Sequence, residues 1–318
     1  MSRKFQCKAI PSIWLEHNGR RLDCQPYMSG AIEAKELLNG LSARKDYLRD
    51  LCNGGMDGVV NAGRIARVWV DGPEHGYPFL SSTDILQADL SSASFIAKSV
   101  ARQNRQLRIK KNWSLITRSG SIGRMAYSRP DMDGMACSED VLRLVPDEDK
   151  VMPGYIYAYL TTKFGVPLVT SGTYGSIITH LEPHHIAKLP VPRLGPIEEQ
   201  VHELVQMSAD LLSTYQAKIN EGTKLFFESA GLTDITPSEW HAWSSDLGFA
   251  TTVGMQSLRA LNFTPRFKRL CDRIKQGPWK PLGELCVLGT LKRIPRISSR
   301  IDADPEFAYR LIGQKELF

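Results

Sequence analysis

The feature that most constrains this chain is residues 197–230, in which apolar residues recur at alternating steps of four and three. This repeat is typical of a helix that pairs with another helix. No proline interrupts the stretch, and Gly231 follows where a helix commonly ends. At 1.5 Å per residue the helix would be about 50 Å long, more than a compact domain needs. We predict a spacer helix, although an ordinary long core helix would give the same pattern. Its predicted seam, which would bind a partner helix, consists of Ile197, Val201, Leu204, Leu211 and Tyr215.

The residues before this helix favour an extended approach and a sharp start. Residues 189–192 read LPVP, and two prolines so close together exclude a helix there. Pro196 suits the first helical position, where its missing N–H costs nothing. Glu198 and Glu199 then suit the positive end of the helix dipole.

Charge is distributed unevenly along the chain. Residues 90–130 contain nine Lys or Arg and no Asp or Glu, although the whole chain has 34 acidic residues and a net charge of +6. The rest of the chain therefore carries a net charge of −3. Such a tract predicts a surface for a polyanion, with an ordinary solvated face as the alternative. The cations predicted to contact phosphates are Lys98, Arg102, Arg105, Arg108, Lys110 and Lys111.

A predicted hairpin lies inside this tract. Residues 113–118 have the β-branched and aromatic content of a strand, the turn SGSIG follows, and residues 125–127 leave it. Glycine lets a backbone approach a ligand closely, while Arg and Ser can contact base edges. The predicted base-contacting residues are Arg118, Ser119, Ser121 and Arg124, and weaker candidates from the later Gly-rich loop are Tyr174, Ser176 and His180. A hairpin whose arginines merely face water is the alternative.

The pattern of the remaining segments predicts an α+β fold, because strands and helices alternate without a βαβ rhythm. Predicted strands cover residues 9–15, 62–70, 77–80 and 141–145, and predicted helices cover residues 32–41 and 154–162.

Three short sequence motifs of the N-terminal region recur in the same order near the C-terminus. Residues 22–26, 48–52 and 77–80 correspond to residues 261–265, 282–286 and 309–312. This order predicts a duplicated domain, with chance similarity of short words as the alternative. The expected domains are a first domain at 1–194, a spacer helix at 195–231, a linker at 232–254, and the start of a second copy of the domain at 255–318, which we expect to stop before it is complete.

The sequence offers little sign of catalysis. It contains no phosphate-binding Gly-x-x-x-x-Gly-Lys-Ser/Thr loop and no Asn/Asp-Pro-Pro-Tyr/Phe motif of amino-methyltransferases. The six cysteines form no Cys-x-x-Cys pair, so we expect reduced thiols and no metal site. No apolar run is long enough for a membrane span, and the N-terminus lacks a signal-peptide core. We therefore expect a cytoplasmic, non-catalytic protein.

Three short motifs, HLE at 180–182, LPVP at 189–192 and EEQ at 198–200, are followed by the predicted long helix. Together they resemble the specificity (S) subunit of type I restriction–modification systems. The hairpin at 115–124 also resembles one that recurs in target-recognition domains of that family. Residues 77–86 and 172–181 stand where the family has related segments.

The resemblance implies a subunit that directs other subunits to a bipartite target in double-stranded DNA. It implies methyltransferase (M) and restriction (R) subunits as partners, with S-adenosylmethionine, ATP and Mg on those partners and no cofactor in this chain. A recognition subunit of a related DNA-methylation or phage-defence system would look the same. An RNA-binding module using residues 120–123 as a backbone clamp, or a stand-alone nuclease or methyltransferase, are remoter alternatives.

Overall fold

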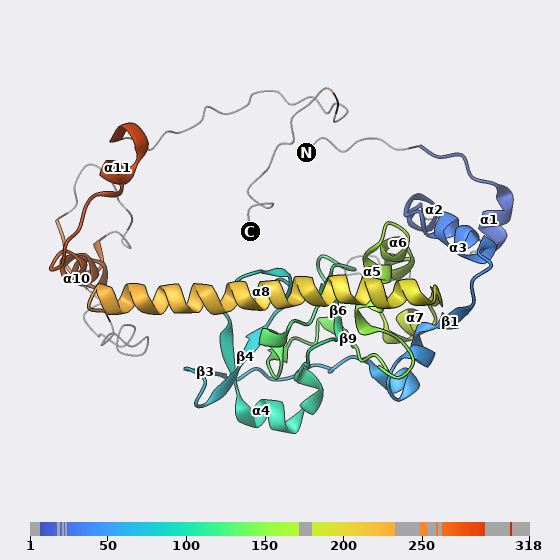
Figure 1. Ribbon diagram of the computed structural model, residues 1–318, viewed down its shortest axis with the longest axis horizontal. Coiled ribbons are helices and arrows are strands. Elements are labelled where there is room, and N and C mark those ends of the chain that lie inside the picture. Colours follow the sequence, from blue (N-terminus) through green and yellow to red (C-terminus); the bar gives the residue numbers. More distant parts are fainter. Residues whose placement is uncertain are drawn as a thin grey trace. The chain divides into compact units, whose positions relative to one another are not determined.

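The computed structural model describes residues 7–17, 20, 22, 24–171, 180–232, 249–252, 259, 263–289 and 306. Contacts divide the chain into two compact units, residues 1–218 and 219–318. The boundary falls within one unbroken helix, α8 (Pro196–Ser229), drawn in yellow and orange in Figure 1. Helices and antiparallel sheets are mixed in the first unit, so the predicted α+β class and the long helix are confirmed.

The described residues of the first unit form three small sheets. In the two-stranded sheet β1 and β10 are antiparallel, one four-stranded sheet has the order β2-β9-β6-β7, and the other has the order β3-β5-β4-β8. All pairings are antiparallel except β4 with β8. The strands are β1 (Lys45–Tyr47), β2 (Val59–Val60), β3 (Trp69–Val70), β4 (Gly76–Leu80), β5 (Ser94–Ala97), β6 (Ser114–Thr117), β7 (Met125–Tyr127), β8 (Ala136–Cys137), β9 (Val141–Leu144) and β10 (Pro190–Pro192).

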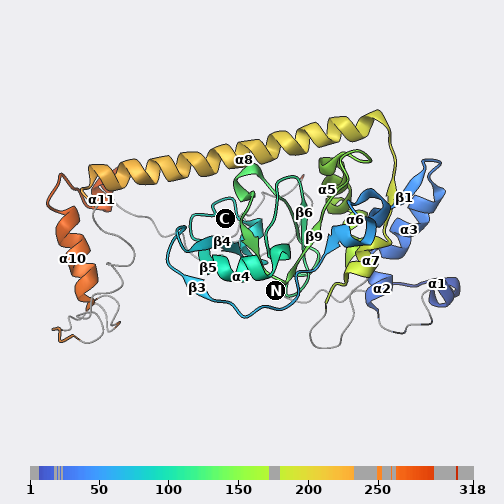
Figure 2. The same ribbon diagram turned by 90° about the horizontal axis from the view of Figure 1, so that it is seen from below.

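Short helices surround these sheets. In Figure 2, α5 lies beside the N-terminal part of α8, and Gly154 N–H of α5 donates to Nδ1 of His202 at 3.1 Å. The α-helices of the first unit before α8 are α1 (Ser12–His17), α2 (Gln25–Met28), α3 (Ala31–Gly40), α4 (Lys98–Gln103), α5 (Pro153–Thr161), α6 (Gly165–Thr170) and α7 (Pro183–Ala187). The 3₁₀ helices are η1 (Leu48–Leu51), η2 (Gly55–Gly58), η3 (Asp84–Leu86), η4 (Arg105–Leu107) and η5 (Pro130–Met132).

Two of the predicted strands are wrong. Residues 12–17 form α1, because Trp14 packs against Tyr27 and Ile32 and its Nε1–H donates to Glu36 at 2.7 Å. Of residues 62–70, only Trp69 and Val70 pair with a neighbouring strand. The predicted helices at 32–41 and 154–162 and the strands at 77–80 and 141–145 are confirmed as α3, α5, β4 and β9 within one or two residues.

The core is held together by a charged side chain as well as by apolar packing. Arg143 of β9 is completely buried, and its guanidinium donates to the carbonyl oxygens of Cys137, Ser138, Val141 and Leu107. Cys137 belongs to β8, so Arg143 joins the two four-stranded sheets. Burial lowers the pKa of Arg143, and the carbonyl dipoles replace the water that the charge has lost.

The start of α8 is fixed by an ion-pair cluster. The Glu198 carboxylate, 5% exposed, accepts from Nε and Nη2 of Arg193 at 3.1 and 2.8 Å and from the Leu194 N–H at 2.6 Å. Arg193 also donates to Asp46 at 3.0 Å. Burial by itself would raise the pKa of Glu198, but these hydrogen bonds hold it below its ordinary value. The helix therefore leaves the domain in a defined direction.

The LPVP segment is extended, as its prolines predict, and forms β10. Its carbonyl groups accept hydrogen bonds from α5: Tyr159 Oη donates to Pro190 O at 2.6 Å, and Tyr155 Oη donates to Pro192 O. Proline has no N–H to donate, but its carbonyl oxygen still needs a donor. The two tyrosine hydroxyls supply that donor to the carbonyls of Pro190 and Pro192.

Within the first unit α8 has two different faces. One face packs on the domain through buried Ala209 and Gln216, whose side-chain oxygen accepts from the Leu90 N–H at 2.6 Å. The other face carries an apolar stripe that is exposed. Its members and their exposed fractions are Ile197 (52%), Leu204 (67%), Met207 (59%), Leu211 (64%) and Tyr215 (43%). The prediction of a continuous helix with an exposed stripe is confirmed, but Val201 of the predicted seam is half-buried and packs against the core of the domain, because it lies on the covered side of the helix.

The described part of the second unit is small. It contains α10 (Pro265–Ile274), α11 (Leu282–Leu285) and η8 (Val287–Gly289). At the end of α8, Gly231 has φ +64 and its carbonyl accepts from Arg273 at 2.8 Å. Among the residues placed by the structure, no helix is both long and apolar enough to cross a membrane.

The Glu198 cluster predicts a pH-dependent stability. We expect Glu198→Gln to lower the free energy of unfolding at pH 7 by roughly 2–3 kcal/mol, because Arg193 loses its charged partner. The folded pKa of Glu198 is lowered, so its contribution is present above the unfolded value near 4.5 and is lost as pH falls through the folded value. Urea unfolding should therefore show a difference between wild type and variant that shrinks in acid. Glu199→Gln, at an exposed neighbour, is the control, and equal losses in both variants would contradict this account.

Candidate nucleic-acid interface

The structure gathers most of the predicted phosphate-contacting cations around one open groove of about 940 Å³. The groove lies between α4 and η4 on one side and the segment that leads into β6 on the other. Its charged and aromatic lining residues are Tyr77, Arg102, Arg105, Arg108, Lys110, Lys111, Trp113, Asp133 and Glu148. Five of the six predicted cations are therefore close together in space as well as in sequence.

These five cations are exposed, and within the described part of the chain none of them forms an ion pair. The sixth, Lys98, donates to the Glu74 carbonyl at 2.7 Å and lies 6.0 Å from the ring centroid of Tyr77. Arg108 lies over the same ring at 4.4 Å. Tyr77 therefore connects Lys98 to the groove.

The floor of the groove is a rigid backbone ladder. Ile109 N–H donates to Met135 O, and Gly134 N–H donates to Ile109 O, each at 2.9 Å. Lys111 N–H donates to the Asp133 carboxylate at 3.0 Å. Asn112, which has φ +68, then turns the chain into β6. The backbone that carries the cations is thus fixed, while most of their side chains extend into solvent.

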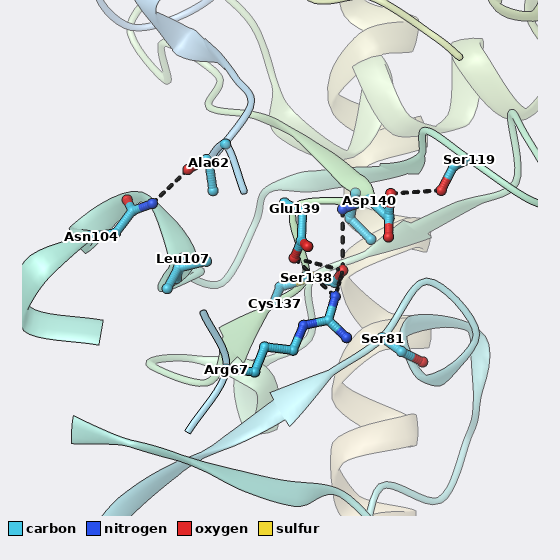
Figure 3. Close-up of polar contacts among 12 residues, drawn as sticks. Ala62, Arg67, Ser81, Asn104, Leu107, Ser119, Cys137, Ser138, Glu139 and Asp140 are labelled. Carbon is cyan, nitrogen blue, oxygen red and sulfur yellow. Dashed lines mark hydrogen bonds and ion pairs between the residues drawn. The ribbon is translucent and has the colours of Figure 1, made fainter. Parts of the chain in front are cut away.

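The opposite wall is fixed by Asn104, which separates α4 from η4. Its side chain accepts from Gln106 N–H at 3.1 Å and donates to Ala62 O (Figure 3). The same view shows Arg67 reaching Glu139 at 3.0 Å and Ser138 at 3.3 Å. Arg102 and Arg105 therefore stand on two short helices that Asn104 connects to residue 62.

Acidic residues bound the groove on one side. Glu148 is part of its lining, and the adjoining pocket of about 400 Å³ is lined by Asp147, Glu148 and Asp149 beside Lys110 and Trp113. A polyanion in the groove would be repelled from that side. The charge distribution therefore favours a polyanion that leaves the groove over Arg102 and Arg105.

The predicted hairpin forms, but two of its polar side chains already have partners. β6 and β7 pair in antiparallel register from Ser114↔Tyr127 to Ile116↔Met125. Arg118, half-buried, donates to Glu182 at 2.7 Å and to Leu181 O at 3.1 Å. Ser119 donates to Asp140 at 2.7 Å (Figure 3). Ser121 and Arg124 are exposed, and Arg124 lines a second groove beside α8.

His180 lies next to this hairpin, because Leu181 N–H donates to Arg118 O at 3.1 Å. The nearby His185 bonds to Leu168 O at 2.9 Å, and burial lowers its pKa, so it favours the neutral form. Tyr174 and Ser176, the other two weaker candidates, lie outside the described residues.

The two predicted sets of contact residues occupy opposite ends of β6. Lys110, Lys111 and Trp113 precede the strand, whereas Arg118 to Arg124 follow it. A strand of four residues spans about 14 Å. The structure thus keeps the predicted phosphate contacts and the predicted base contacts apart, and their roles remain predictions.

Three groove residues were missed by the sequence, and one residue of the tract is not at a surface. Tyr77, Asn112 and Trp113 line the groove, and the aromatic residues interleaved with cations were the available signal. Arg129, counted in the acid-free tract, is 3% exposed, pairs with Asp131 at 2.7 Å and donates to Ala88 O. It is a structural residue.

No protein-family model matches the chain, and no curated protein sequence matches it. Among solved structures, the S subunit of a type I restriction–modification system from M. genitalium is similar, with 14% identity, a TM-score of 0.40, and coverage of 64% of this chain and 49% of that one. The HsdS subunit from Thermoanaerobacter tengcongensis has 13% identity, a TM-score of 0.38, and coverage of 70% and 55%.

A third similar chain comes from a structure described as the basis of complex assembly and conformational transition of the type I R-M system. It has 13% identity, a TM-score of 0.36, and coverage of 70% of this chain and 57% of that one. The chain spans about half the length of the solved structures that it matches.

The hairpin contacts predict that its two arginines differ. Arg118→Ala should lower the free energy of unfolding by about 1–3 kcal/mol, because Glu182 and Leu181 O lose a half-buried donor. Arg124→Ala should change it by no more than about 0.5 kcal/mol, because the side chain is exposed. Urea unfolding of both variants measures this, and equal effects would show that the Arg118 contacts do not stabilise the hairpin.

Proposed function

We propose that this chain is the non-catalytic DNA-recognition subunit of a type I restriction–modification complex, and that its first unit binds double-stranded DNA. The observation that carries the proposal is the groove with its five exposed cations, none of which forms an ion pair with a described residue. Five like charges around one groove repel one another in the free protein. A phosphate backbone would neutralise them and release its counterions.

The sequence motifs support the choice of a specificity subunit among polyanion binders. The hairpin at 115–124, the LPVP strand and the spacer helix occur in the order that the family resemblance implies, and each folds as an ordered element of this chain. A related DNA-methylation or phage-defence system would use the same kind of subunit and is the alternative within this class.

A second recognition domain is part of the proposal. The short helix η1 (Leu48–Leu51) and the short helix α11 (Leu282–Leu285) stand on corresponding words, and each is followed by another short helix, η2 or η8. These matches support a second copy that begins near residue 255 and reads the other half of a bipartite site. The corresponding residues Leu261 and Tyr309 lie outside the described residues.

The exposed stripe of α8 supports the proposal that partner subunits bind this helix. Side chains such as Leu204 and Leu211 are exposed on a helix whose opposite face is already packed. We propose that methyltransferase subunits, and through the complex restriction subunits, assemble on this helix. S-adenosylmethionine, ATP and Mg would then belong to those partners.

The groove predicts a uniform electrostatic contribution from its exposed cations. Arg105→Ala or Lys110→Ala should weaken binding of the full chain to all duplex sequences alike and reduce the salt slope by about one. The measurement is fluorescence anisotropy with a randomised duplex pool at about 50 and 200 mM salt. Lys163→Ala, an exposed lysine outside the groove, is the matched control. Failure of the wild-type chain to bind duplex DNA would refute the proposal, and preference for single-stranded RNA would favour the RNA-binding alternative.

The stripe on α8 predicts a separable assembly defect. Leu204→Asp together with Leu211→Asp should abolish association with a methyltransferase subunit while leaving the first unit folded, because both side chains are exposed. Sedimentation of the mixed proteins measures association, and circular dichroism checks folding. Ala217→Asp, exposed on the same helix but off the stripe, should have no effect. Unchanged association in the double variant would exclude this face as the partner surface.

A further inference from the structure

One cation of the groove is held in a fixed position, unlike its neighbours. The guanidinium carbon of Arg108 lies 4.4 Å from the ring centroid of Tyr77, and its Nε–H donates to Gly134 O at 3.2 Å. Arg108 also forms an isolated antiparallel bridge with Ala136 through its backbone. Stacking and a hydrogen bond therefore restrict both the tilt and the rotation of the guanidinium plane.

The end of the Arg108 side chain is left available. Its two terminal nitrogens, Nη1 and Nη2, make no hydrogen bond or ion pair with any residue that the structure places. For the other four cations of the groove, no side-chain hydrogen bond or ring contact to the described residues is present. Arg108 thus presents a pre-oriented pair of donors, whereas the neighbouring cations have no such contacts with the described residues.

Gly134 maintains the space for this arrangement. It has φ +78, which favours glycine, and a Cβ at this position would lie 2.8 Å from Nη2 of Arg108. Its N–H is fixed to Ile109 O at 2.9 Å, so the backbone cannot easily withdraw. Any side chain at residue 134 would therefore displace the end of Arg108.

We propose that Arg108 is a specificity-determining residue that reads a guanine in the major groove through Nη1 and Nη2. This inference rests on the proposed function and deepens it. Two parallel N–H donors match the O6 and N7 acceptors of guanine, and this pairing discriminates by geometry, so it benefits from a fixed guanidinium. A phosphate contact requires only charge, which the mobile neighbours supply.

The proposal changes the role that the sequence alone assigns to Arg108. The sequence places it among the phosphate contacts and gives base reading to Arg118 and Arg124. In the structure Arg118 already pairs with Glu182, whereas the terminal nitrogens of Arg108 are open to a ligand. The orientation of the donors, which sequence cannot show, distinguishes the two arginines.

The first test is Arg108→Lys in the full chain, measured by selection and anisotropy on a randomised duplex pool. Lysine keeps the charge but cannot present two parallel donors. We expect a roughly 10- to 100-fold loss on the preferred sequence, a relaxed preference at one guanine, and an unchanged salt slope. Arg105→Lys, at an unanchored arginine of the same groove, is the control and should leave the preference unchanged.

The second test moves Arg108 without altering it. Gly134→Ala should displace its guanidinium and relax the preference at the same guanine, with no change in net charge. Gly63→Ala is the matched control, because Gly63 also has positive φ, at +70, but has open space around it. Thermal unfolding of both variants separates the backbone strain that they share from the displacement specific to residue 134.

The outcomes separate this inference from the proposed function. If wild type selects a sequence and Arg108→Lys selects the same one with similar affinity, Arg108 contacts a phosphate and the inference is overturned while DNA recognition stands. If both Arg108→Lys and Gly134→Ala relax one and the same position, the inference is supported. If wild type binds no duplex, the proposed function itself fails.

Discussion

The buried guanidinium of Arg143 is the interaction on which the architecture of the first unit depends. It carries a charge in the interior without a carboxylate partner among the described residues. Backbone carbonyls of η4, β8, β9 and Ser138 surround it. Each of those carbonyls would be costly to leave unpaired in the same place. Because one of them belongs to Leu107, the residue before Arg108, the same contact that joins the sheets also positions the wall of the cationic groove.

From this arrangement follows a division of the surface. The groove and the hairpin loop lie at opposite ends of β6, so mobile cations and ordered polar side chains are presented at separate places. Within the groove, the side chains of four cations make no hydrogen bond to the described residues, so they can adjust to the shape of a phosphate backbone. Arg108, in contrast, is oriented by Tyr77 and Gly134. A surface that combines a general attraction for phosphates with a few fixed donors is what sequence-specific DNA binding requires.

The long helix likewise has one part that is fixed by contacts and one surface that is left exposed. Its first turn is fixed by Arg193 and Glu198, and one face is covered by the domain. The other face exposes Leu204 and Leu211 at a spacing of seven residues, a pattern that favours a second helix or a partner subunit. The contacts of the covered face are partly polar, as in the bond from Leu90 N–H to Gln216, so this packing requires a specific register along the helix.

The sequence by itself determined the elements whose signals are local. Three such elements are the long helix with its proline start, the hairpin around residues 118–124, and the helix predicted at 32–41 and found at 31–40. They follow from periodicity, turn chemistry and proline geometry, which act between near neighbours. It also indicated that the cations of residues 98–111 belong together, because they lie within 14 residues of one another. It misassigned residues 12–17, where packing of Trp14 on Tyr27 and Ile32 overrides local strand propensity.

Only the tertiary structure decided which charged residue does what. Arg108, Arg118, Arg129 and Arg143 are chemically identical in the sequence, yet one is stacked and open, one is paired at a hairpin, one is buried against Asp131, and one joins two sheets. Their differences arise from Tyr77, Glu182 and Leu107, partners that are 31, 64 and 36 residues away from Arg108, Arg118 and Arg143 along the chain. The environment of a charge is set by atoms brought together in the folded state, so no local pattern could have distinguished Arg108, Arg118 and Arg143, whereas the partner of Arg129, Asp131, is only two residues away.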